Sequence, residues 1–256
     1  MWVSKQTLTG TGPVGRHGVP AIVSGICGLA LWLAAIGPAA GVEPKAPYPN
    51  MAPLAQYRMS RSAEIALARS AAPASIANDA DVLVLGERAN ETAVKGKNGF
   101  VCVVERSWAK DFDDVDFWNP KIRGPICFNP AAARSVFADY LQRTVWVLAG
   151  VSKSAMLART KAALAAKTVV APEAGAMCYM MSKQGYLSTA DGRWHPHLMF
   201  FLARTDGATW GADLKGSPVF AAQDDLEHVT TFMVPVTNWS DGTPAVDATP
   251  AVMAMH

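Results

Sequence analysis

The sequence predicts an α+β fold, in which an antiparallel sheet carries a helical hairpin packed on one face. Three observations lead to this prediction. Residues 81–106 hold three apolar runs whose glycine-containing links are too short for helical crossovers. Residues 129–167 have the apolar spacing of two helices with a short link. Residues 176–236 return to strand-like runs between polar links.

The first part of the folded region predicts one short helix and three strands. Ser60 or Ser62 is a suitable N-cap, the alanines that follow favour a helix, and Pro73 ends it. The next three apolar runs predict an antiparallel meander. They span residues 81–86, 91–96 and 99–106. The third run is apolar at both alternating sets of positions, so we expect both of its faces to be covered.

Each helix of the predicted hairpin begins at a recognisable cap. Asn129 can cap the first helix, over residues 129–150, and Pro130 fits its first turn. Ser152 can cap the second, which ends near Lys167. The predicted apolar stripe of the first helix comprises Val136, Tyr140, Leu141 and Val145. Four strands follow, at residues 176–182, 197–203, 217–220 and 229–236.

The N-terminal segment has the layout of a secretory signal peptide. Residues 1–41 contain Lys5, Arg16 and no acid, then an apolar run and small residues, which predicts cleavage after Gly41. The alternative is an uncleaved membrane anchor, because the apolar run is close to the shortest length that spans a bilayer. Either way we expect an exported protein, periplasmic or extracellular.

The remaining chain divides into three parts. Residues 42–57 are rich in proline and predict an extended linker, residues 58–240 a single α+β domain, and residues 241–256 a flexible tail. Residues 1–41 hold two basic side chains and no acidic one, which accounts for the chain's net charge of +2. Residues 42–256 therefore have no net charge. This gives no reason to expect nucleic acid as a partner, or membrane contact beyond the signal segment.

Three cysteines remain after the signal segment. In an oxidising compartment two of them would form a disulfide, and Cys102 with Cys127 is the predicted pair. The stretch between them is polar and contains proline, so it needs anchoring, and closing it would contribute roughly 3–4 kcal/mol. The alternative is that these two and Cys178 are all reduced and buried as small apolar residues.

The stretch "RWHPHLMFF", residues 193–201, is a candidate metal site for copper or zinc. On a strand, His195, His197 and Met199 would share one face. A hairpin with the preceding strand would bring the sulfur of Cys178 beside them, and His228 could add a third nitrogen. The alternative is that the histidines lie at the entrance of a strand and the methionine fills the core.

Two further readings concern catalysis and binding. Cys178 could act as the nucleophile of a cysteine-dependent hydrolase or transferase, with His195 or His197 as its base, although its apolar neighbours would raise the thiol's pKa. The aromatic and acidic loop that follows residue 106 could instead form a recognition surface. Its candidate binding residues are Trp108, Phe112, Phe117, Trp118 and Arg123. The alternative is a loop that packs its own aromatic rings.

No motif decides between these readings. "GTGPVG", residues 10–15, has the spacing of a dinucleotide-binding loop but lacks a preceding strand. "SWAK", residues 107–110, has the Ser-x-x-Lys spacing of penicillin-recognising enzymes without their other motifs. The sequence therefore favours an exported, soluble binding or structural module, whose partner is a small ligand, an envelope component or a protein. Whether it is an enzyme stays open.

Overall fold

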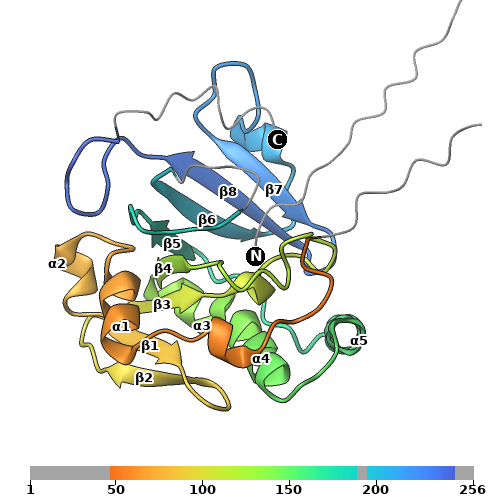
Figure 1. Ribbon diagram of the computed structural model, residues 1–256. Helices are drawn as coiled ribbons and strands as arrows, with labels where there is room; N and C mark the ends of the chain where they lie inside the picture. Colours follow the sequence, from red (N-terminus) through yellow and green to blue (C-terminus); the bar gives the residue numbers. More distant parts are fainter. Residues whose placement is uncertain (1–46, 189–194, 246–256) are drawn as a thin grey trace, which may run out of the picture. The chain divides into compact units, whose positions relative to one another are not determined.

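The computed structural model describes residues 47–188 and 195–245, which build one eight-stranded sheet and several helices (Figure 1). The strand order is β2-β1-β3-β4-β5-β6-β8-β7. The strands are β1 (Asp81–Leu85), β2 (Asn90–Val94), β3 (Val101–Glu105), β4 (Gly124–Phe128), β5 (Met177–Met180), β6 (His197–Ala203), β7 (Phe220–Asp224) and β8 (Val229–Pro235). Every described pair is antiparallel except β1 with β3. The predicted α+β class is confirmed. The signal segment, part of the linker and the end of the tail lie outside the described residues.

The first three strands depart from the predicted meander. Strands β1 and β2 form the expected antiparallel hairpin, but β3 pairs in parallel with the other edge of β1. The meander prediction is therefore wrong at this point. The reason lies in polarity: no residue of β2 is buried, which suits an edge, whereas four of the five residues of β3 are buried and require neighbours on both sides.

Helices flank both faces of the sheet. Their bounds are η1 (Leu54–Gln56), α1 (Arg61–Arg69), α2 (Ala74–Ala77), η2 (Ser107–Ala109), α3 (Pro130–Arg134), α4 (Phe137–Leu148), α5 (Lys153–Ala165) and η3 (Gly207–Trp210). Helix α1 packs on β1, β3 and β4, and together with α2 it covers Cys102 and Val104 of β3. Val103 belongs to a second cluster on the opposite face, which includes residues of α4 and α5. Both faces of β3 are thus covered, as predicted.

The predicted first helix of the hairpin is broken in two. Asn129 accepts a hydrogen bond from Ala132 N and caps α3, but Ser135, with φ −116° and ψ −95°, interrupts the helix before α4. The predicted stripe is partly wrong, because Val145 is 38% exposed. The buried residues of α4 are Phe137, Tyr140, Arg143, Thr144 and Val147. Ser152 caps α5 as predicted, by accepting from Ala155 N.

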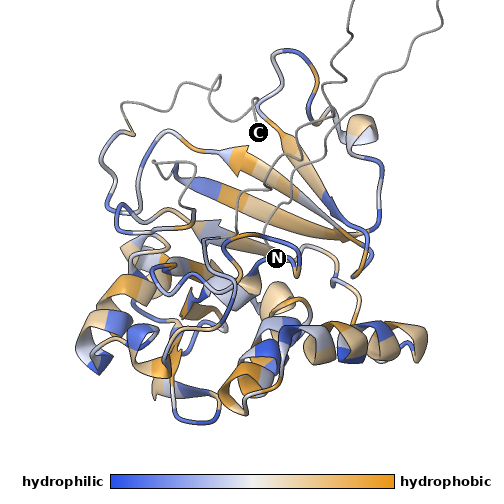
Figure 2. Cartoon of the chain, turned by 45° about the vertical axis from the view of Figure 1, so that its right-hand side comes forward, coloured by the Kyte–Doolittle hydropathy of each residue, from blue (hydrophilic) through white to orange (hydrophobic). Residues whose placement is uncertain are grey.

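The later strands follow the prediction closely. Strands β5 and β6 form the expected antiparallel hairpin, and β8 pairs with β6 along its whole length. Strand β7 begins at Phe220, later than the predicted run at 217–220. Figure 2 shows hydrophobic residues along β6 and β8, which agrees with their place inside the sheet. No helix in the described ranges combines the length and the apolar character needed to cross a bilayer.

Cys102 and Cys127 are joined in a disulfide, the pair predicted from the sequence. They are direct partners in the register of β3 and β4, and both side chains are fully buried beneath α1. The bridge therefore links two inner strands and fixes both ends of the loop between them. Cys178 is reduced and buried.

Candidate functional site

The residues of the predicted metal site are only partly brought together. Cys178 is the direct register partner of Met199, and Met180 that of His197, so these side chains share one face of β5 and β6. Nδ1 of His197 lies 2.8 Å from the carbonyl oxygen of His195, and burial lowers the pKa of His197 to about 4. The ring is therefore a neutral, buried group at the start of β6.

His228 lies far from the other predicted ligands. It immediately precedes Val229, which pairs with Ala203 at one end of β6, whereas His197 pairs with Pro235 at the other end. Six residues of extended chain separate the two positions, about 20 Å. Within the ranges that the structure describes, no three His, Cys, Asp or Glu side chains are grouped so that they could hold a metal ion. The predicted five-ligand set does not converge.

Cys178 lacks the surroundings of a nucleophile. Its side chain is fully buried, and burial raises the pKa of the thiol well above its usual value, with the nearby charge of Glu105 adding to the rise. A reactive cysteine needs the opposite, an accessible sulfur and a stabilised thiolate. Cys178 instead packs with Met180 and Met199 in the core.

The aromatic loop packs its own rings. Trp108, Phe112, Phe117 and Trp118 are all buried and belong to the main core cluster. Arg123 donates to the carbonyl oxygens of Pro120, Ile122 and Gln56, which ties the loop to η1. Buried rings offer no exposed flat area, so the expected recognition surface is not formed by these residues. Nε1 of Trp108 donates to Oγ1 of Thr144, which holds the loop against α4.

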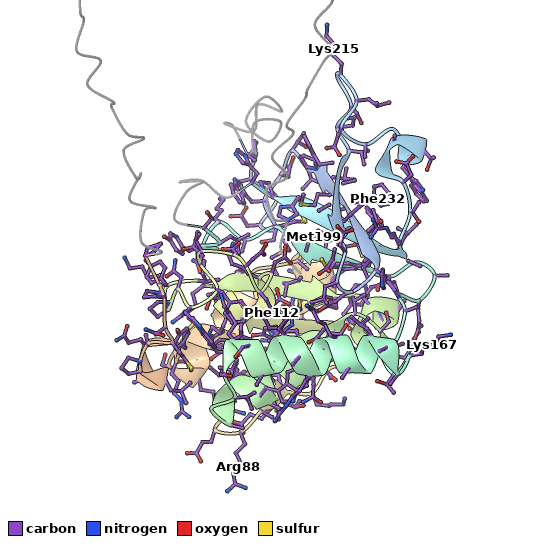
Figure 3. The ribbon with its side chains drawn as sticks, turned by 90° about the vertical axis from the view of Figure 1, so that its right-hand side faces the viewer. Arg88, Phe112, Lys167, Met199, Lys215 and Phe232 are labelled. Carbon is purple, nitrogen blue, oxygen red and sulfur yellow. A yellow bond between two sulfur atoms is a disulfide. The ribbon has the colours of Figure 1, made fainter. Side chains whose placement is uncertain are left out.

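A cleft lies between α4 and the sheet, and we call it the acidic cleft. It is lined by Glu105, Ala109, Ile126, Phe128, Val136, Asp139, Tyr140, Arg143, Met199, Phe201 and Glu227. Its volume of about 30 Å³ gives room for one or two water molecules or a small polar group. Figure 3 labels Met199, on the sheet side of the cleft, and Phe112, whose ring lies 4.6 Å from the guanidinium carbon of Arg143.

Arg143 is the cation of this cleft, and the fold holds it rigidly. It comes from the buried side of α4 and is 6% exposed. One terminal nitrogen donates to the carbonyl oxygens of Trp108 and Lys110, at 3.4 and 3.0 Å. The other donates to Oε1 of Glu227, from the turn between β7 and β8, in a short ion pair. Three separate parts of the chain thus meet at this guanidinium: α4, the segment that begins at η2, and the turn between β7 and β8.

Glu105 is the unusual group of the cleft. It ends β3, is 3% exposed and lines the cleft. Within the described ranges its carboxylate forms no hydrogen bond and no ion pair, and its oxygens reach the cleft and are not sealed from solvent. Burial raises its pKa, and the positive charge of Arg143 counteracts the rise only in part. A carboxylate that faces a cleft and has no donor from the fold can accept hydrogen bonds from water or from a ligand there.

Two other acids near Arg143 also have raised pKa values. Burial raises the pKa of Asp139 to about 6, and the negative charge of Glu227 adds to this. Burial also raises the pKa of Asp111 to about 6, with a contribution from Asp224. Carboxyl groups with pKa values near neutrality in a cleft are typical of functional sites. We therefore take the acidic cleft as the candidate site.

Sequence reasoning missed this cleft, although two signals point to it. Asp139 and Arg143 are four residues apart, which places both on one side of a helix. Arg143 also follows Val136 by seven residues and Tyr140 by three, which puts a charge on the apolar stripe itself. A charged residue within an apolar stripe indicates a buried ion pair or a site.

Comparison with known proteins finds no similar one: no family model, no curated protein and no solved structure matches the chain. The function is therefore argued from the residues of this chain alone.

Proposed function

We propose that this chain is an exported binding protein that takes a small ligand into the acidic cleft. The observation that carries the proposal is Glu105, a carboxylate that is 3% exposed, lines the cleft and has no hydrogen-bond partner among the described residues. Evolution tolerates such a group where a ligand supplies the missing partner. Arg143 and Tyr140 are held rigidly beside it, so the cleft is formed before the ligand arrives.

Export is part of this proposal. The basic lead, apolar run and small residues of segment 1–41 support it. The disulfide between Cys102 and Cys127 supports it too, because disulfides persist mainly in oxidising compartments.

A cleft-filling variant tests the proposal. Val136 lines the cleft at the start of α4, and Val136→Phe would occupy its volume. We expect fragments from a mixed panel of small neutral, anionic and cationic compounds to bind the wild-type protein in ligand-observed NMR. The same fragments should lose their binding to Val136→Phe.

The matched control is Val145→Phe, the same substitution on the exposed side of the same helix. It should bind the fragments as the wild type does, which separates filling of the cleft from an effect on α4. Equal fragment binding by Val136→Phe and Val145→Phe would contradict the proposal, and so would a panel in which nothing binds the wild type.

A further inference from the structure

Among the described residues that line it, the acidic cleft has more acidic than basic side chains. Glu105, Asp139 and Glu227 line it, and Arg143 is the one Lys or Arg side chain among its lining residues. Arg143 already donates to Glu227 and to two backbone carbonyl oxygens. When all three acids are ionised, the cleft therefore carries an excess of two negative charges, and one of them, on Glu105, has no donor in the described residues.

The composition of the cleft favours an organic cation over a metal ion. No three metal-ligating side chains are grouped in the described part of the chain, so an inorganic cation would lack most of its ligands. A primary ammonium group brings three N–H donors and no acceptor, which is what an unpartnered carboxylate needs. The cleft volume of about 30 Å³ admits a group of that size but not a planar guanidinium with its substituents.

Glu105 shares its face of the sheet with apolar residues of the cleft. Ile126 and Phe128 of β4, with Met199 and Phe201 of β6, lie on this face, and Val136, just before α4, lines the cleft too. A fully hydrated ion gains nothing from such a wall, whereas an alkyl group buries apolar surface there. Charge and apolar surface thus line the same small space.

We infer that the ligand of the acidic cleft is a small organic primary amine. Its ammonium group donates to the carboxylate of Glu105 beside Asp139, and its alkyl body packs on β4 and β6. The inference rests on the proposed function, because it names the ligand class of the same cleft.

The inference predicts a direction for the effect of pH. Asp139 takes up a proton below about pH 6, while an alkylamine stays protonated throughout this range. Among the described residues, the charges that act on Asp139 are those of Glu227, Arg143 and Asp224. The negative potential of the cleft therefore falls as the pH is lowered, and the amine should bind more weakly at pH 5 than at pH 7.5.

The test is a titration of the purified protein with three probes of similar size that suit a cleft of about 30 Å³: methylammonium, methanol and formate. We expect methylammonium to bind most tightly at pH 7.5. Glu105→Gln should weaken it by about tenfold or more, the usual effect of losing a charged hydrogen bond. Glu87→Gln, the same change at an exposed position, should leave the affinity within about twofold of the wild type.

The outcomes separate this inference from the proposed function. If methanol or formate binds as tightly as methylammonium, or Glu105→Gln has no effect while Val136→Phe still abolishes binding, the assignment of an amine is wrong and the cleft remains a binding site. If no probe and no panel fragment binds the wild type, both fail. Should Glu105→Gln not fold, Asp139→Asn takes its place, with an expected loss of affinity and of its pH dependence.

Discussion

Two buried arginines define two regions of this protein, and these regions differ in how many acidic side chains surround the arginine. Arg106 is fully buried and donates to the carbonyl oxygens of Tyr57 and Val104 and to Oε1 of Glu64. Glu64 in turn accepts from Leu85 N, so its carboxylate has two donors, and the charge of a second arginine, Arg123, also acts on this pair. Arg143 also pairs with one glutamate, but further acids surround it, and Glu105 has no donor within residues 47–188 and 195–245.

The difference teaches which polar groups serve the fold and which serve something else. A buried ion pair with all its hydrogen bonds made is a stable structural unit, and it joins α1, β1, β3 and the segment around η1. Surplus buried carboxylates reduce stability, because burial disfavours their charged form. Proteins keep such groups where binding or chemistry requires them. The comparison therefore singles out the acidic cleft without reference to any relative.

The largest expected effect comes from breaking the balanced pair. Glu64→Gln would leave the guanidinium of Arg106 buried without a counter-charge, so we expect the free energy of unfolding to fall by about 3–5 kcal/mol. Urea denaturation at pH 7.5 measures it. The control is Glu91→Gln, which breaks the exposed ion pair with Arg61 and should cost less than about 1 kcal/mol. Equal losses in the two variants would remove the distinction between the regions.

A smaller, pH-dependent loss is expected for Arg143→Met. At pH 7.5 the variant loses the pair with Glu227 and leaves the neighbouring acids without a cation, at a cost of about 2–4 kcal/mol. Asp111 and Asp139 have pKa values of about 6, so at pH 5 they are largely neutral and the loss should be smaller. Urea denaturation at both pH values measures it.

The control for Arg143→Met is Arg134→Met, which removes an exposed arginine paired with Glu173. Its effect should be below about 1 kcal/mol and similar at both pH values. If Arg143→Met cost the same at pH 5 and pH 7.5, the surplus acids would not depend on this cation, and the electrostatic account of the cleft would be wrong.

Local features of the fold were predictable, and long-range ones were not. Asn129 and Ser152 act as caps because capping depends on a few neighbouring residues. The pairing of Cys102 with Cys127 followed from the need to anchor the loop between them. The parallel pairing of β3 with β1 was missed, because several strands compete for the same edge and the sequence alone does not rank them.

The candidate site was missed for a related reason. Glu105 looked like the polar end of an apolar run, and nothing local shows that α4 covers it. The histidines and the aromatic loop were predicted as sites because they gather rare residue types in a short stretch of sequence. In the structure, Trp108 and His197 both lie in the interior. Surplus charge becomes visible only when distant segments are placed together.

The smallest expected effect is a gain in stability. Burial and the charge of Glu227 raise the pKa of Asp139 to about 6 in the folded protein, above its value of about 4 in an unfolded chain. The folded state therefore binds this proton more tightly, and its stability falls as the pH rises from about 4 to 6. Asp139→Asn removes that loss. Because Asp139 is half-buried and partly screened by solvent, we expect a gain of only about 1 kcal/mol at pH 7.5 and none at pH 4.

Urea denaturation of Asp139→Asn at the two pH values distinguishes this from a general effect of removing an acid. Asp113→Asn, at an exposed position of the neighbouring loop, is the control and should change stability by less than about 0.5 kcal/mol at either pH. A loss of stability in Asp139→Asn at pH 7.5 would show that its charge supports the fold, as that of Glu64 does. The contrast between the two arginines would then be one of degree, and the acids of the cleft would no longer require a ligand to explain them.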